Sequence, residues 1–549
     1  MSLSRFQSTV LSLLISVSCF LTCLGNNDVP VQLNDDVLGL IVFKSDLQDP
    51  SSHLASWNED DANPCSWQFV QCNPQSGRVS EVSLDGLGLS GKIGRGLEKL
   101  QHLTVLSLSH NNLSGSISPS LTLSNTLERL NLSHNALSGS IPTSFVNMNS
   151  IKFLDLSQNS FSGPIPENFF DTCSSLHQIS LARNMFDGPV PGSLSRCSSL
   201  NSLNLSNNRF SGNVDFNGIW SLTRLRTLDL SNNALSGSLP NGVSSIHNLK
   251  EILLQGNQFS GPLSTDIGFC LHLSRLDFSD NQFSGALPES LGRLSSLSYF
   301  KASNNFFTSE FPPWIGNLTS LEYLELDHNQ FTGSIPQSIG ELGSLSHLRL
   351  SSNKLVGTIP SSLSSCTKLS VIHLRGNGFN GSIPEGLFGL GLEEMDLSRN
   401  ELSGSIPEGS SRLLETLSSL DLSDNHLQGN IPAETGLLSK LSYLNLSWND
   451  LQSQMPPEFG LLQNLAVLDI RNSALRGSVP ADICDSGNLA VLQLDGNSLQ
   501  GNIPEEIGNC SSLYLLYASY FSSQSFTFCA RLFWKILICS TFMQEFVSQ

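Results

Sequence analysis

The chain has 549 residues and a net charge of −19, and only 14% of its residues are charged. A chain this acidic is a poor candidate for binding the phosphate backbone of nucleic acids, which requires clustered Lys and Arg. The length exceeds what one ordinary hydrophobic core supports, so we expect an array of smaller units.

Residues 1–25 have the features of a secretory signal peptide. Arg5 supplies a positive start, residues 10–24 form an apolar run, and small Gly25 precedes polar residues. An N-terminal membrane anchor is the alternative, but the run is shorter than the ~20 apolar residues of a span and no stop-transfer pattern follows. A cleaved signal predicts a secreted chain, in which disulfides can form.

Residues 26–78 precede the repeats and are expected to form a cap. The spacing of four apolar residues predicts an amphipathic helix: Val37, Leu40, Ile41 and Phe43. Trp57 and Trp67 are expected to cover the open end of the first repeat, which would otherwise expose its leucines. A separate small domain is the alternative.

A pattern of the form LxLSxN recurs about every 24 residues between residues 79 and 516, in 18 units and the start of a nineteenth. We call the last position of this pattern the ladder position. It is Leu87 in the first unit, Ser473 in the seventeenth and Asn in the others. This period and pattern are the signature of leucine-rich repeats.

One unit, residues 127–142, explains the physics of the pattern. Leu130 and Leu132 alternate with polar residues, which predicts a strand with its apolar face turned inward. The Asn135 amide can bond the backbone of neighbouring turns, and Gly139 and Pro142 suit a tight return. A single unit cannot bury its apolar face, so the units must stack into a solenoid.

The LSGxIP wording of the units resembles the plant-type leucine-rich repeat, and residues 63–115 resemble plant leucine-rich-repeat receptor-like kinases of the probably inactive kinase group. The resemblance implies an α/β-type solenoid, a right-handed superhelix with a parallel sheet on its concave face, a second short sheet and an N-terminal helical cap. Family members carry an ectodomain, one membrane helix and a kinase-like domain. This chain matches the ectodomain only.

Seven of the twelve cysteines fall into two groups. Cys65 and Cys72 lie in the cap, and in a secreted cap we expect them to be bonded. Five others lie 11 residues before a ladder position and are interpreted as small buried apolar residues: Cys173, Cys197, Cys270, Cys366 and Cys510. A bridge between Cys173 and Cys197, one repeat apart, stays open as an alternative.

Seven Asn-x-Ser/Thr sequences are possible glycosylation sites: Asn112, Asn131, Asn204, Asn317, Asn380, Asn445 and Asn509. Asn131, Asn204 and Asn445 belong to the predicted strands and would point from the concave face. Glycans there would block partners locally.

The sequence contains no kinase motif, no H-E-x-x-H and no paired C-x-x-C. His110, His134 and His328 share one slot before the ladder position, which we interpret as a variable surface position rather than a metal site. We therefore predict no catalytic residues, no metal, no cofactor and no enzymatic activity for this chain.

A contact patch is predicted where three columns of the repeat change together, across repeats 10 to 13. The column four residues before the ladder position is Asp, Asn or Ser in most units, and the columns two and six before it change in the same place. The predicted patch consists of Tyr299, Lys301, Tyr323, Glu325, Asp327, His347, Arg349, His373 and Arg375. The alternative is a solvated face on which Lys301, Glu325 and Arg349 neutralise one another. Tyr443 with Trp448 is a second candidate.

Residues 517–549 show neither the repeat period nor a cap pattern, and Arg531 and Lys535 interrupt any membrane span. We interpret this tail as a translated intron or shifted frame that exposes Phe and Trp. The expectation is poor secretion or aggregation, rescued by a polar capping repeat in its place.

The sequence therefore predicts an extracellular module that binds a peptide, a cell-wall fragment or a co-receptor ectodomain, and no nucleic acid. It would be secreted to the apoplast, or lie at the plasma membrane if a full-length product carries a transmembrane segment. The alternative is a secreted inhibitor of microbial wall-degrading enzymes, although such inhibitors have about ten repeats and a Cys-bearing C-terminal cap.

Overall fold

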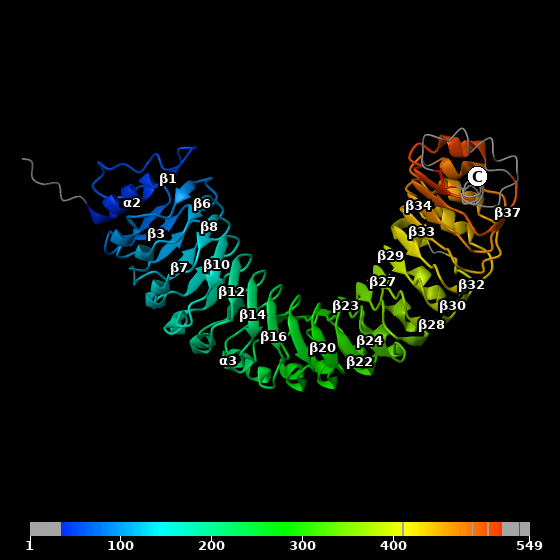
Figure 1. Ribbon diagram of the computed structural model, residues 1–549, viewed down its shortest axis with the longest axis horizontal. Coiled ribbons are helices and arrows are strands. Elements are labelled where there is room, and N and C mark those ends of the chain that lie inside the picture. Colours follow the sequence, from blue (N-terminus) through cyan, green and yellow to red (C-terminus); the bar gives the residue numbers. More distant parts are fainter. Residues whose placement is uncertain are drawn as a thin grey trace, which may run out of the picture.

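The computed structural model describes residues 34–123, 125–408, 411–485, 487–501, 504–518 and 537–538. The predicted signal peptide, residues 1–25, and most of the predicted tail lie outside the described residues. The chain forms a solenoid that curves into an arc, with the cap at one end and the last repeats at the other (Figure 1). The fold class predicted from the sequence is confirmed.

The principal sheet receives one strand from each repeat, and successive strands pair in parallel from β3 onward. Its strands are β2 (Val70–Cys72), β3 (Val79–Ser83), β5 (Val105–Ser107), β7 (Arg129–Asn131), β9 (Phe153–Asp155), β11 (Gln178–Ser180), β13 (Ser202–Asn204), β15 (Thr227–Asp229), β17 (Glu251–Leu253), β19 (Arg275–Asp277), β21 (Tyr299–Lys301), β23 (Tyr323–Glu325), β25 (His347–Arg349), β27 (Val371–His373), β29 (Glu394–Asp396), β31 (Ser419–Asp421), β33 (Tyr443–Asn445), β34 (Val467–Asp469), β36 (Val491–Gln493), β38 (Leu515–Tyr517) and β39 (Leu537–Ile538).

Further strands run beside the principal sheet, as the family resemblance implies. A 12-stranded sheet is followed by a four-stranded and a two-stranded sheet. Their strands are β1 (Leu47–Gln48), β4 (Ser90–Lys92), β6 (Asn112–Gly115), β8 (Ala136–Gly139), β10 (Ser160–Pro164), β12 (Met185–Gly188), β14 (Arg209–Asn213), β16 (Ala234–Gly237), β18 (Gln258–Gly261), β20 (Gln282–Gly285), β22 (Phe306–Glu310), β24 (Gln330–Thr332), β26 (Val356–Thr358), β28 (Gly378–Gly381), β30 (Glu401–Gly404), β32 (His426–Leu427), β35 (Arg476–Gly477) and β37 (Ser498–Leu499).

Short helical turns occupy the outer edge of the arc (Figure 1). The α-helices are α2 (Asp35–Ser45), α3 (Phe216–Trp220) and α4 (Ser411–Thr416). The 3-10 helices are η1 (Leu97–Lys99), η2 (Pro119–Leu123), η3 (Thr143–Asn147), η4 (Cys173–Ser175), η5 (Gly192–Arg196), η6 (Val243–Ser245), η7 (Thr265–Phe269), η8 (Glu289–Arg293), η9 (Pro313–Asn317), η10 (Gln337–Glu341), η11 (Ser361–Ser365), η12 (Glu385–Gly389), η13 (Ala433–Leu437), η14 (Pro457–Leu461), η15 (Ala481–Cys484) and η16 (Glu505–Asn509).

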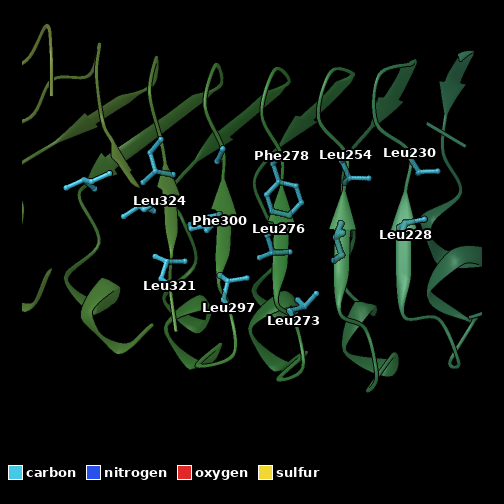
Figure 2. Packing of buried hydrophobic residues seen from close by; sticks show 14 of the residues in the cluster. Leu228, Leu230, Leu254, Leu273, Leu276, Phe278, Leu297, Phe300, Leu321 and Leu324 are labelled. Carbon is cyan, nitrogen blue, oxygen red and sulfur yellow. The ribbon is translucent and has the colours of Figure 1, made fainter. Parts of the chain in front are cut away.

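The core is one continuous column of buried side chains. Equivalent inward positions of successive repeats lie side by side along the solenoid, as Leu276, Phe300 and Leu324 show (Figure 2). The ladder Asn closes each turn: the Asn281 amide donates to the carbonyls of Leu254, Phe278 and Ser279 at 2.9–3.2 Å. Its Oδ1 accepts the Phe259 N–H at 3.0 Å. Each repeat with a ladder Asn therefore holds its predecessor through one side-chain amide.

The cap covers the first repeat with α2 and a pair of indoles. Trp57 and Trp67 are buried and stack with ring centroids 5.7 Å apart. Asp36, fully buried in α2, pairs with the Arg78 guanidinium at 2.7 Å and accepts the Val79 N–H at 2.9 Å. The helix is thereby tied to the first strand of the repeats through a charge that keeps its partners.

Three disulfides are present among the described residues, and two of them differ from the interpretation of buried apolar cysteines. The cap bond joins Cys65 to Cys72, whose Cα atoms lie 5.4 Å apart. Cys173 is bonded to Cys197, and Cys510 is bonded to Cys484. The stacking of neighbouring repeats brings the second and third pairs to Cα distances of 4.9 and 5.0 Å, within the range that a disulfide needs.

Cys270 and Cys366 fit the original interpretation. Both are free and buried, and burial raises the pKa of each thiol to about 11. Neither is therefore a reactive thiolate at neutral pH.

Candidate functional site

Four residues before the ladder position, the side chain has a structural role in most repeats. Asp229 Oδ1 accepts hydrogen bonds from the Ser231 N–H at 3.1 Å and the Ser231 hydroxyl at 2.6 Å. The bond to the N–H two residues on, an Asx turn, recurs at Asn131, Asp155, Asn204, Asp277, Asp396, Asp421, Asn445 and Asp469. Most of this column therefore shapes the backbone and is not available for varying specificity.

In repeats 10 to 13, the residue at this position is not one that forms the Asx turn. The column holds Lys301, Glu325, Arg349 and His373 there, none of which can replace it. In repeat 12 a neighbouring side chain compensates, because Asp327 Oδ1 accepts the Ser351 N–H at 2.7 Å. Four consecutive repeats have thus exchanged a backbone-fixing residue for a charged or imidazole side chain on the inner strands, which is typical of a functional region.

A row of rings lies across the strands of the same repeats. Tyr299 and Tyr323 have centroids 5.3 Å apart, and Tyr323 stacks on His347 at 4.4 Å. The Arg275 guanidinium lies 4.7 Å from the Tyr299 ring. All three ring residues are half-buried, and burial lowers the pKa of His347, so this ring is neutral at pH 7. The row offers apolar area with polar edges.

The charged residues of the patch do not all neutralise one another. Lys301 and Glu325 form a 2.8 Å ion pair, and Lys301 also lies 4.7 Å from the Tyr299 ring. Burial lowers the pKa of Lys301, but its hydrogen bonds to Glu325 and Tyr299 outweigh burial and raise the pKa overall. The Arg349 guanidinium, by contrast, makes no hydrogen bond or ion pair with any described residue, and its Nε is buried without a partner.

Three further patch residues are engaged within the protein. His373 Nε2 lies 3.1 Å from Glu394 Oε2, and Arg375 donates to Ser398 Oγ at 3.2 Å. Burial raises the pKa of Asp327, although the Ser351 N–H opposes this change.

An open cavity of about 440 Å³ lies over this region. Five predicted residues line it: Lys301, Glu325, Asp327, Arg349 and His373. The other four predicted residues, Tyr299, Tyr323, His347 and Arg375, belong to the same repeats but not to the cavity lining.

The cavity also extends into repeats 8 and 9, through residues that sequence reasoning did not select: Gln255, Asp277, Ser279 and Asp280. Asp277 and Ser279 match the repeat pattern and gave no signal. Only Leu253 and Gln255, which depart from the pattern in repeat 8, could have pointed there.

The second candidate site consists of Tyr443 and Trp448 in repeat 16, and these two residues lie in different environments. The Tyr443 hydroxyl lies 3.3 Å from Asp421 Oδ2 and accepts from the Asn445 amide at 3.2 Å, so it is engaged within the sheet. Trp448 is 57% exposed on a turn with positive φ. The two side chains thus lie in different environments, and their joint site stays a prediction.

The glycosylation sequences divide by environment. Asn131, Asn204 and Asn445 hold Asx turns, whereas Asn112, Asn317 and Asn380 are exposed. The side chain of Asn509 lies outside the described part of the structure. Among the described residues, no helix is long and apolar enough to span a membrane, and no cluster of metal-ligating side chains occurs.

Comparison with known proteins supports this architecture. The leucine rich repeat N-terminal domain matches residues 33–73. Leucine rich repeat models match residues 101–161, 224–246, 272–294, 302–355, 320–379, 391–413, 416–438, 440–462 and 488–510.

Two solved plant receptors resemble this chain over most of its length. The plant peptide hormone receptor RGFR1, solved in complex with RGF2, is 30% identical with a TM-score of 0.71, and the match covers 82% of this chain and 84% of that one. The Arabidopsis receptor kinase HAESA, in complex with the peptide hormone IDA and the co-receptor SERK1, is 30% identical with a TM-score of 0.65, over 89% and 94% of the two chains. The chain belongs to the family of plant leucine-rich-repeat receptor-kinase ectodomains.

Curated relatives match this chain over shorter segments, with higher sequence identity. A probably inactive leucine-rich repeat receptor-like protein kinase of Arabidopsis thaliana is 64% identical over 104 residues. The probable receptor-like serine/threonine-protein kinase IRK of the same plant is 67% identical over 79 residues. These segments cover 18% and 14% of this chain, and only 10% and 8% of the relatives' own lengths.

Proposed function

We propose that this chain is an extracellular, non-enzymatic recognition module that holds a peptide against the concave side of repeats 10 to 13. The contact patch would consist of the nine predicted residues, with Tyr323 and Arg349 as its anchors. A cell-wall fragment and a co-receptor ectodomain are the other partners that the sequence predicts.

The observation that carries this proposal is the unpaired Arg349 guanidinium beside a row of stacked rings. A charged group that is partly withdrawn from water without a partner costs free energy, so its retention favours a partner outside the chain. Tyr and Arg are also the residue types that most often dominate the free energy of binding at interfaces.

The comparisons favour the receptor over the inhibitor alternative. RGFR1 and HAESA are receptors whose structures contain a bound peptide hormone, and both match this chain over more than four fifths of its length. Secretion to the apoplast and the absence of catalysis in this chain belong to the same proposal.

The test begins with a library of random dodecapeptides selected on the secreted chain, followed by calorimetric measurement of Kd for a recovered peptide. We expect Tyr323→Ala and Arg349→Ala each to weaken binding at least about tenfold, because truncating an anchor residue typically costs more than ~2 kcal/mol. Thermal midpoints should not change. Phe153→Ala is the matched control, since Phe153 is a half-buried ring in the same column with the Arg129 guanidinium over it. Unchanged affinity in both anchor variants would move the site elsewhere.

A further inference from the structure

We propose that the end of the cavity built by repeats 8 and 9 binds a cationic group of the ligand: the guanidinium of Arg, the ammonium of Lys or a free N-terminus. This inference rests on the proposed function, because it assigns a chemistry to one end of the same site. Four residues carry it, and none of them belongs to the predicted patch: Gln255, Asp277, Ser279 and Asp280.

The charge balance of the cavity is the first step. Its lining contains the carboxylates Asp277, Asp280, Glu325 and Asp327, and the permanent cations Lys301 and Arg349. The 2.8 Å pair of Lys301 with Glu325 removes one charge of each sign. Three carboxylates then face one guanidinium, and His328 and His373 are the other titratable side chains of the lining. An incoming cation would reduce this excess of negative charge.

Buried acceptors without donors are the second step. In repeats 7, 14 and 15 the Ser hydroxyl equivalent to Ser279 donates to its Asp at 2.6 Å. Ser279 is only 9% exposed, yet its Oγ is buried without a well-formed hydrogen bond, and so is Gln255 Oε1. Both atoms belong to residues that line the cavity. A buried acceptor without a donor is unfavourable, so a ligand rich in N–H donors is the matching partner.

The two carboxylates beside these acceptors retain hydrogen-bonding capacity. Asp277 accepts the Ser279 N–H at 3.0 Å, and Asp280 accepts the Asn304 amide at 2.8 Å. An ionised carboxylate offers about four lone-pair positions, so each keeps free positions for a multidentate cation. Burial raises the pKa of Asp277, although the Ser279 N–H and the nearby Lys301 charge oppose this change.

The repeat itself supplies isosteric variants for the test. Asn holds the Asx turn in place of Asp at Asn131, Asn204 and Asn445, so Asp277→Asn removes the charge and keeps the turn. Asn also stands at the equivalent of Asp280 in repeat 10, as Asn304. The double variant Asp277→Asn/Asp280→Asn is compared with Asp155→Asn/Asp229→Asn, which removes the same charge from turns outside the cavity.

The probe is a dodecapeptide recovered from a random library selected on the secreted wild-type chain. We expect the pool to be enriched in Lys and Arg, and the cavity double variant to weaken the Kd of a recovered peptide about tenfold, since each charge-assisted hydrogen bond contributes a substantial part of such a change. The control double variant should bind like wild type. Replacing the basic residue of the peptide by citrulline or norleucine should abolish the difference between the two double variants.

A pool without basic enrichment, or equal affinity of the two double variants, would overturn the inference. If Tyr323→Ala still weakens binding in that case, the proposed function stands and only the cationic subsite is wrong. If Tyr323→Ala and Arg349→Ala both bind like wild type, both proposals fail.

Discussion

At the residue scale, the ladder Asn and the Asx-turn residue have different roles: the first bonds the backbone of neighbouring turns, and the second fixes the local backbone. Asn281 bonds three carbonyls and one N–H, whereas Asp229 orders the two residues that follow it. Where the second device is missing, in repeats 10 to 13, the side chains are free to serve another purpose.

The Asx turn gives a prediction for stability. Asp229→Ala should lower the free energy of unfolding by about 1 kcal/mol, because the N–H and the hydroxyl of Ser231 lose their acceptor. Asp229→Asn should change it much less, since Asn serves the same turn at Asn204. Urea titrations of the two variants measure this difference. Equal losses in both would show that the charge, not the turn, matters.

Asp277 gives a prediction for pH dependence. Burial raises its pKa above the ordinary value of 3.8. A carboxyl with a raised pKa in the folded state stabilises the fold below its unfolded pKa, and this contribution is lost as the pH rises through the folded pKa. Asp277→Asn cannot ionise, so its thermal midpoint should exceed that of wild type at pH 7, and the gain should vanish at pH ~4 and below. Calorimetric scans at both pH values measure the gain, and a lower midpoint at pH 7 would contradict the account.

At the scale of elements, the disulfides link neighbouring repeats. The bond between Cys173 and Cys197 closes a loop with a sequence separation of 24 residues. Cys173→Ala/Cys197→Ala should therefore lower the free energy of unfolding by about 3 kcal/mol in the chain-entropy model. Urea unfolding of the double variant and of wild type measures this loss. Cys366→Ala is the control, because it also leaves a cavity but breaks no disulfide. A loss no larger than in the control would rule out a stabilising bridge.

Thiol labelling gives a separate prediction. Under native, non-reducing conditions neither Cys270 nor Cys366 should react with iodoacetamide, because both are buried and the pKa of each thiol is about 11. In urea without reductant both should be labelled, whereas Cys65 and Cys72 should not. Peptide-level mass spectrometry reads each site. Labelling of Cys65 in the folded chain would contradict the cap disulfide.

The repeat period makes the elements easy to predict and the exceptions hard. The roles of Leu130 and Asn135 can be predicted because the same residue types recur at these positions in many repeats. The cap helix can be predicted from the spacing of four apolar residues. The disulfides at Cys173 and Cys510 depend on distances between neighbouring turns. The sequence spacing of the cysteines limits these distances but does not determine them. Ser279 is the clearest limit: it matches the repeat pattern, and only the structure shows that its hydroxyl oxygen is buried without a hydrogen-bond partner.

At the scale of the whole molecule, most repeats use an inner-strand side chain to fix the backbone. Repeats 10 to 13 near the middle of the arc do not. The cavity and the row of rings lie in neighbouring repeats near the middle of the described chain, far from the cap. Stacked repeats hold this region rigidly because each contacts its neighbours over a continuous core (Figure 2). A ligand would therefore meet a largely preformed surface.

The location of a bound peptide tests the central claim most directly. A library-selected dodecapeptide that carries a photoreactive diazirine is cross-linked to the secreted chain, and the cross-linked residues are mapped by mass spectrometry. We predict cross-links within residues 253–375, on β17 to β27, that disappear with excess unlabelled peptide. Cross-links confined to the outer 3-10 helices, or to the inner strands of repeats 2 to 6, would contradict the account.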